Sequence, residues 1–147
     1  MIDIEFRVGI SPKPSNKRHA FVIAGQARVV QDSGVVKHQA QIAACAAAHR
    51  PSTVIDEPVN VTVVCVFPRP QGLCGVSKRT GLPLQDRGRR WHTSRPDADN
   101  CAKSVLDGLK SWWRDDCIVA ELVVRKMVAA LGESPGYEVR IASLGAA

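Results

Sequence analysis

The most apolar stretch of the chain, residues 59–67, places the strongest constraint on the fold. Val59, Val61 and Val63 alternate with polar residues at its start, whereas its end is apolar on both faces. Such a strand is typical of the centre of a sheet that is covered on both sides. Pro68 ends the predicted strand, because proline cannot donate a hydrogen bond to a sheet ladder. The sequence therefore predicts a sheet with residues 59–67 at its centre.

The rest of the chain supplies elements that can complete such a sheet. Alternating apolar residues predict strands over 2–10, 117–130 and 137–144. Short strands over 21–23 and 27–30 flank Gly25-Gln26, which predicts a hairpin. We therefore expect one α/β domain of the α+β type over residues 1–147, with a mixed sheet packed against two main helices.

The first predicted helix covers residues 35–49 and is rich in alanine and glutamine. We expect Ile42, Cys45 and Ala46 to face inward. His38 and His49 are expected to be exposed helix residues rather than metal ligands.

The second predicted helix follows Arg95-Pro96 and reaches Leu109. Arg95 is held extended because it precedes a proline, so Asp97 or Asp99 can cap the helix. One face then carries Asp99, Lys103 and Asp107, which recur every four residues, and another carries Cys101, Val105 and Leu109.

An acidic pair, Asp115-Asp116, follows this helix directly after Trp112-Trp113. Carboxylates that converge in space repel one another, and a hard divalent cation such as Mg²⁺ offsets that repulsion. A nearby lysine adds a point charge suited to phosphate. The plainer alternative is a capping aspartate, two solvated ion pairs on the helix and a surface turn.

These residues resemble a known family, the RusA-type Holliday junction resolvases. The resemblance rests on Pro96-Asp97-Ala98-Asp99-Asn100, Lys103, Leu106-Asp107-Gly108-Leu109 and Trp113-Arg114-Asp115-Asp116. It implies that Asp97, Asp99 and Asp116 bind Mg²⁺, with Mn²⁺ as the alternative ion, and that Lys103 is needed for cleavage. It also implies a homodimer that acts on four-way DNA junctions, because two symmetric nicks need two equivalent sites. A weaker similarity covers Ser11–Arg18.

Three neighbouring polar residues are assigned supporting roles. Asp107 either orients Lys103 or solvates the helix. Asp115 is expected to be structural or to support the site indirectly, because its side chain should point to the other face of an extended chain. Asn100 is expected to support the backbone of the Asp97 loop.

The positive charge is concentrated in one part of the chain. The net charge is +6, and residues 69–95 alone carry seven basic residues and one acid, Asp86. Residues 71–94 show little periodicity and are expected to form a long basic loop, which suits a phosphodiester substrate. Ser11–Arg18 is either a second phosphate-contacting segment or a solvated connector. The candidate DNA contacts are Lys13, Lys17, Arg18, Lys78, Arg79, Arg87, Arg89, Arg90 and Arg95.

The remaining features narrow the function further. Trp91 is expected to anchor the loop rather than to stack on a base. Five cysteines without a C-x-x-C motif predict small structural residues rather than a disulfide framework or a zinc site. No apolar run approaches the ~20 residues of a membrane span, and no signal peptide is evident, so a cytoplasmic protein is expected. Another metal-dependent DNA nuclease, flap-specific or non-specific, and a non-catalytic basic DNA-binding protein remain as alternatives.

Overall fold

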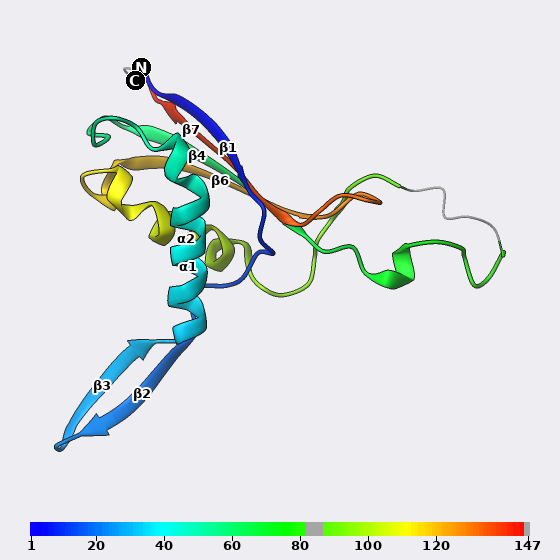
Figure 1. Ribbon diagram of the computed structural model, residues 1–147, viewed down its shortest axis with the longest axis horizontal. Coiled ribbons are helices and arrows are strands. Elements are labelled where there is room, and N and C mark those ends of the chain that lie inside the picture. Colours follow the sequence, from blue (N-terminus) through cyan, green and yellow to red (C-terminus); the bar gives the residue numbers. More distant parts are fainter. Residues whose placement is uncertain (82–86, 146–147) are drawn as a thin grey trace.

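The computed structural model describes residues 1–81 and 87–145 as a five-stranded sheet, a separate hairpin and two main helices (Figure 1). The strands are β1 (Asp3–Val8), β2 (Arg18–Ile23), β3 (Gln26–Gln31), β4 (Val59–Phe67), β5 (Arg90–Trp91), β6 (Val119–Val128) and β7 (Gly136–Ser143). The helices are α1 (Ser33–Ala46) and α2 (Ala98–Leu109), with short 3₁₀ helices at Ala47–His49, Gln71–Leu73, Lys110–Trp112 and Asp116–Ile118. The predicted α+β class is confirmed, and the predicted elements follow the predicted order, with the two-residue strand β5 added inside the loop predicted over 71–94.

Strand β4 lies at the centre of the sheet, whose order is β1-β7-β4-β6-β5. It pairs with β7 in antiparallel and with β6 in parallel orientation. A parallel pair needs a crossover, and α2 lies in the connection between β4 and β6. The central position predicted for residues 59–67 is therefore correct, and it is what brings α2 onto the sheet.

The prediction that β4 is covered on both sides is only partly correct. Val59, Val61, Val63 and Cys65 on the helix side are completely buried. On the other side Val66 is also completely buried, but residues 60, 62 and 64 are half-buried. The second face of this strand is therefore covered at its carboxyl end only.

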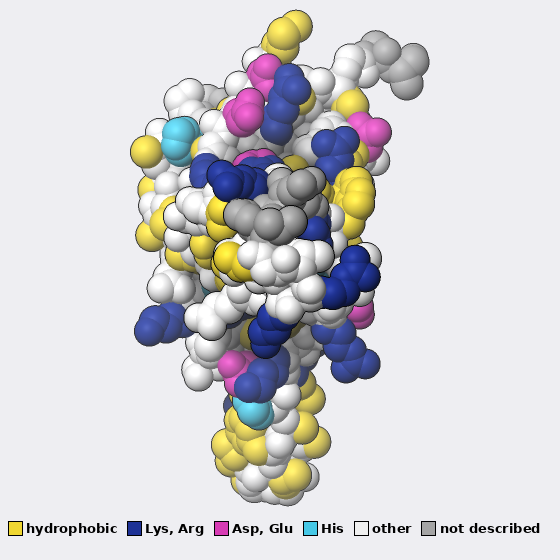
Figure 2. Space-filling view, turned by 90° about the vertical axis from the view of Figure 1, so that its right-hand side faces the viewer, with side chains coloured by type: hydrophobic (Ala, Val, Ile, Leu, Met, Phe, Trp, Pro, Cys, Tyr) yellow, Lys and Arg dark blue, Asp and Glu magenta, His cyan; other side chains and the backbone are white. Residues whose placement is uncertain are grey.

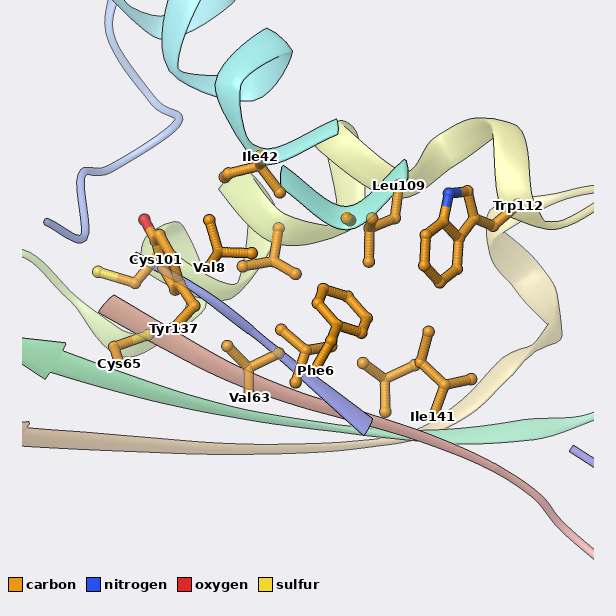
Figure 3. Close-up of a cluster of buried hydrophobic side chains, with 14 of the residues drawn as sticks. Phe6, Val8, Ile42, Val63, Cys65, Cys101, Leu109, Trp112, Tyr137 and Ile141 are labelled. Atoms are coloured by element: carbon orange, nitrogen blue, oxygen red, sulfur yellow. The ribbon is translucent and has the colours of Figure 1, made fainter. Parts of the chain in front are cut away.

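The helices pack on one face of the sheet and close a single core beneath them (Figure 3). Cys101, Val105 and Leu109 of α2 are completely buried, which confirms the predicted apolar face. Ile42 of α1 points into the same core. Burying an aliphatic side chain of this size contributes about 1.5–3 kcal/mol, so this face fixes the rotation of α2.

Gly108 sets how closely α2 approaches α1. A Cβ atom at this position would lie 2.9 Å from Cγ2 of Ile42 and 3.1 Å from the carbonyl oxygen of Gln39. Only a residue without a side chain fits there, so Gly108 allows the two helices to meet.

The predicted hairpin is confirmed, and it is longer than expected. Strands β2 and β3 form a six-pair antiparallel ladder from Arg18↔Gln31 to Ile23↔Gln26. The hairpin extends away from the sheet and the helices, below the start of α1 in Figure 1. Every residue of the two strands is exposed except the half-buried Gln31.

Three expectations about single side chains are wrong. Cys45 is exposed although it was expected to face inward, because Ile42 and Ala46 already occupy the buried stripe of α1. His38 is buried, not exposed, because it lies on that same stripe. Trp91 is 68% exposed instead of anchoring the loop, because the next residue, His92, points inward and stacks on Phe67.

Other expectations hold with small changes. The strand predicted to begin at Cys117 begins at Val119, because residues 116–118 form a 3₁₀ turn. All five cysteines are free thiols, and Cys65 and Cys101 are buried as small core residues. Within residues 1–81 and 87–145, no helix is long and apolar enough to cross a membrane. Asp86, the one acid of the basic segment, falls outside the described residues.

Replacing Gly108 with valine tests the close helix contact. We expect Gly108→Val to lower the free energy of unfolding by about 2 kcal/mol, because the added side chain collides with Ile42 and with backbone. Gly9→Val is the matched control, since nothing lies within 4 Å of a Cβ atom there. Chemical denaturation measures both variants. Equal stabilities of the two variants would contradict the packing described here.

Candidate metal centre and nucleic-acid interface

The apolar face of α2 decides where its polar side chains point. Because Cys101, Val105 and Leu109 are buried, Asp99 in the first turn and Lys103 one turn later are directed outward and are exposed. Asp97 occupies the N-cap position with an extended backbone, but its side chain makes no capping hydrogen bond. Its carboxylate therefore remains exposed at the start of the helix.

Asp99, Lys103 and Asp116 come together around one pocket. Its volume is about 290 Å³, and it lies between α2, the turn that carries Asp116 and the start of β6. Two exposed carboxylates and an ammonium group thus share one hollow with the half-buried carboxylate of Asp107. The lining residues are Asp99, Lys103, Leu106, Asp107, Trp113, Asp116, Val119 and Leu122.

Asp116 is held in place by its neighbours in the sequence. The indole Nε1 of the buried Trp113 donates a hydrogen bond of 2.8 Å to Oδ1 of Asp116. The amide of Cys117 donates to Oδ1 of Asp115 at 2.9 Å, and this hydrogen bond is the main reason that the pKa of Asp115 is lowered. Asp115 therefore caps the 3₁₀ turn, as a structural residue should, while Trp113 orients the carboxylate of Asp116.

Asp97 lies in a neighbouring hollow rather than in the same pocket. That hollow has a volume of about 420 Å³ and is lined by Pro14, Asn16, Arg95, Pro96, Asp97 and Asn100. Within residues 1–81 and 87–145, no three side chains of the types His, Cys, Asp and Glu form a group that could hold a metal ion. The structure thus brings together two of the three predicted ligands and leaves the third beside them.

The donor set still suits a hard divalent cation. Mg²⁺ keeps several waters and is commonly held by one or two carboxylates together with phosphate oxygens of the substrate. Asp99 and Asp116 are exposed carboxylates that line one pocket. Two carboxylates therefore satisfy the chemistry of a cation that is completed by substrate.

Asp107 has neither of the two roles expected for it. Its Oδ2 accepts hydrogen bonds from Ser15 Oγ at 2.8 Å and from Gln39 Nε2 at 3.0 Å. Gln39 also donates to Ser15 Oγ at 3.0 Å. The Asp107 carboxylate therefore joins α2 to α1 and to the segment before β2. Sequence reasoning missed Ser15 and Gln39, because neither residue stands out from a polar segment and an alanine-glutamine helix.

The first part of the Ser11–Arg18 segment is docked along α2, with Pro12 and Ser15 buried, whereas residues 16–18 are exposed. The backbone amide of Ser15 donates to the carbonyl of Asn100 at 3.2 Å. The hydroxyl of Ser104 donates to the carbonyl of Lys13 at 2.6 Å. These contacts hold the basic segment beside Asp97 and the start of α2, and Asn100 takes part through its backbone carbonyl.

His38 and Tyr137 form a buried pair that holds the segment before β2 through the backbone of Lys13. Nε2 of His38 lies 2.8 Å from the hydroxyl of Tyr137, which also accepts a hydrogen bond from the amide of Lys13. Burial, and then the nearby charge of Lys13, lower the pKa of His38 below its ordinary 6.5. Burial raises the pKa of Tyr137. His38 is thus a neutral hydrogen-bonding partner inside the core.

The predicted DNA contacts divide into two groups. Arg89 pairs with Glu133 and Glu138, and its hydrogen bonds lower the pKa values of both carboxyls. Its charge therefore fastens the basic loop to the turn before β7 and to β7 itself. The other eight candidates all have exposed side chains: Lys13, Lys17, Arg18, Lys78, Arg79, Arg87, Arg90 and Arg95. Figure 2 shows Lys and Arg side chains spread over the middle of one face of the molecule.

A third hollow extends the basic surface beyond the pocket. It measures about 320 Å³ and is lined by Arg18, Val29, Gln31, Gln39, Lys103, Asp107 and Lys110. Sequence reasoning did not select Lys110, although it follows Lys103 by seven residues and so lies on the same helical face. Three cations, from β2, from α2 and from the 3₁₀ helix that follows α2, thus line a hollow that adjoins the carboxylates.

The comparison with protein families agrees with this geometry. A family model described as "Endodeoxyribonuclease RusA" matches residues 10–142. The chain belongs to the RusA endodeoxyribonuclease family. The matched region includes Asp97, Asp99, Lys103 and Asp116, together with every basic residue selected above.

A relative of this RusA family member is a curated protein of Bacillus subtilis (strain 168). The two are 33% identical over 106 residues, which is 71% of each chain. The relative is named "Uncharacterized protein YqaN". That name states no activity, so the relative supports the family relationship only.

The buried His38 gives the fold a pH dependence with a definite sign. The unfolded chain binds a proton at His38 near pH 6.5, whereas the folded chain resists it. The stability of the fold is therefore fully present above that pH and falls as the pH drops below it. We expect the melting temperature of the wild type to fall more between about pH 7.5 and about pH 5 than that of His38→Gln.

The comparison isolates His38 because the other histidines are present in both proteins. Among them, His92 also has a pKa lowered by burial, and it contributes equally to the two melting curves. A wild-type curve and a His38→Gln curve with the same pH dependence would show that His38 is not buried as a neutral side chain.

Proposed function

We propose that this chain is a Mg²⁺-dependent endodeoxyribonuclease that resolves four-way DNA junctions by paired hydrolysis of phosphodiester bonds. The observation that carries the proposal is the meeting of Asp99, Asp116 and Lys103 in one pocket on a basic surface. The family match supports the reaction class, since it describes an endodeoxyribonuclease.

Each residue of the pocket has a stated task. Asp99 and Asp116 would hold the cation, and Asp97, in the neighbouring hollow, is the third candidate ligand. When bound, Mg²⁺, or Mn²⁺ in its place, supplies Lewis-acid polarisation of the phosphoryl group and an activated water. Lys103 neutralises charge that develops on the phosphoryl oxygens. Trp113 keeps the carboxylate of Asp116 aimed at the pocket through its indole hydrogen bond.

The basic residues position the DNA rather than take part in the chemistry. Arg18 and Arg95 line hollows beside the acidic centre, Lys13 and Lys17 belong to the segment before β2, and Lys78, Arg79, Arg87 and Arg90 belong to the long loop. Phosphate contacts of this kind fix the register of a nucleic acid. We leave Arg89 out of this set, because Glu133 and Glu138 already neutralise it.

A homodimer is part of the proposal. Resolution of a four-way junction requires two symmetric nicks, and a two-fold dimer presents two equivalent centres. The acidic centres of such a dimer face DNA, and the surrounding cations offset the repulsion between carboxylates and phosphates.

Single replacements of the carboxylates test the centre. We expect Asp99→Asn and Asp116→Asn each to lower the rate of junction cleavage by at least about a hundredfold, because each removes a charge that holds the cation. The assay uses a labelled synthetic four-way junction with Mg²⁺ and with EDTA. Asp56→Asn is the control, since Asp56 is an exposed aspartate paired with Arg114.

Further DNA substrates and one further variant distinguish the proposed function from its alternatives. Equal cleavage of linear duplex and flaps would indicate a nuclease without junction selectivity. Binding of DNA without any Mg²⁺-dependent nicking would indicate a non-catalytic DNA-binding protein. Wild-type cleavage by Asp99→Asn would reject the site, and wild-type cleavage by Asp97→Asn would remove Asp97 alone from the ligand set.

A further inference from the structure

The hairpin β2–β3 presents an apolar surface that no other part of the described chain covers. Val22 is 70% exposed, Val29 62% and Ile23 54%, and Phe21 and Val30 are also exposed. The lobe at the bottom of Figure 2 is this hairpin, and most of its visible side chains are hydrophobic. A two-stranded hairpin alone is marginally stable in water, and an exposed apolar patch on a soluble protein marks an interaction site.

The base of the hairpin is joined firmly to the helices. Asp32 accepts a hydrogen bond from the amide of Gly34 at the start of α1, and its Oδ2 lies 2.6 Å from Nε2 of His19. Lys17 forms an ion pair with the same carboxylate at 3.4 Å. The contact with His19 is the main cause that lowers the pKa of Asp32 to about 2. The hairpin is thus an arm whose root is set by α1.

One face of the arm is continuous with the candidate metal centre. Arg18, Val29 and Gln31 line the hollow that also contains Lys103 and Asp107. Lys103 and Asp107 line the pocket of the two carboxylates as well. The hollow at the base of the hairpin and the pocket of the centre therefore share a border formed by Lys103 and Asp107.

The charge of the arm indicates which kind of partner it binds. Residues 17–32 contain three basic residues, Lys17, Arg18 and Arg28, and one acid, Asp32, which is paired with Lys17, so the arm keeps a net positive charge of two. Two such arms from two copies of the chain would repel each other, whereas a polyanion would be attracted. A basic stem with an apolar end is also the composition of protein arms that insert apolar side chains between bases.

We propose that the hairpin is a DNA-engaging arm whose apolar tip contacts bases exposed at the branch point of the substrate. The inference rests on the proposed function and adds the element that recognises branched structure. Five steps of a strand extend about 17 Å, so the tip reaches about five nucleotide steps beyond Arg18. In intact duplex the base faces are stacked and hidden, so the tip gains apolar contact only where stacking is broken.

The test measures binding to junction and to duplex separately. Val22→Ser combined with Ile23→Ser should weaken binding of a labelled four-way junction about tenfold, because two apolar contacts are lost. Affinity for linear duplex of the same length should stay within about twofold, because the cations are unchanged. Fluorescence anisotropy in EDTA reports binding without cleavage, and 2-aminopurine beside the branch point reports contact with unstacked bases.

Two further variants serve as comparisons for the tip variant. Val36→Ser combined with Val54→Ser removes two exposed valines elsewhere, 51% and 55% exposed, and should change neither affinity. Arg28→Ala should weaken junction and duplex binding alike and reduce the slope of binding against salt by about one. Circular dichroism confirms that each variant is folded.

The outcomes distinguish the arm from the active centre. Unchanged junction affinity in the tip variant overturns the arm while leaving the proposed nuclease intact. A wild type that binds junctions but never cuts them overturns the nuclease while the arm stands. A wild type without preference for junctions overturns the arm. Loss of a dimer in the tip variant, seen by sedimentation velocity, assigns the hairpin to self-association and also overturns the arm.

Discussion

Burial of the apolar face of α2 is the interaction on which the candidate site depends. Each buried aliphatic side chain contributes about 1.5–3 kcal/mol, and Cys101, Val105 and Leu109 act together. Repulsion between two exposed carboxylates even 4 Å apart in water costs only about 1 kcal/mol. The free energy of burial therefore exceeds the repulsion between carboxylates, and Asp99 faces the pocket even though Asp116 is already there. The repulsion that remains is what a cation offsets.

The surroundings of α2 are built to keep that orientation. Gly108 lets α1 approach, and the Asp107 carboxylate ties α2 to Gln39 and Ser15. The same contacts bring the basic segment 11–18 beside the acidic centre. The helix α2 thus connects the core, the carboxylates and the cations. We expect a substitution that loosens its packing to displace the site residues.

Much of this fold follows from short-range patterns that the sequence displays directly. Alternation in residues 59–67, the hairpin around Gly25 and the two faces of α2 depend on neighbours along the chain, and all three were predicted. The grouping of Asp99, Lys103 and Asp116 was expected from the family resemblance. The place of Asp97 in a second hollow was not, because it depends on how the loop before α2 lies against Asn16 and Pro14.

What escaped prediction depends on contacts between distant segments. His38 is buried because Tyr137, almost a hundred residues later, supplies its hydroxyl partner. Arg89 looked like any other cation of the basic loop until Glu133 and Glu138 were placed beside it. Trp91, the last residue of β5, is exposed because the residue after the strand, His92, points inward and stacks on Phe67. Periodicity along the chain carries no information on such pairs.

Direct observation of the bound cation tests the central claim most sharply. Substoichiometric Mn²⁺ added to isotope-labelled protein broadens the NMR signals of amides close to the ion. The account predicts that residues around Asp99, Lys103 and Asp116 broaden first, and that Asp116→Asn abolishes the effect. Broadening that begins elsewhere, or that persists in Asp116→Asn, would show that these carboxylates do not form a shared cation site.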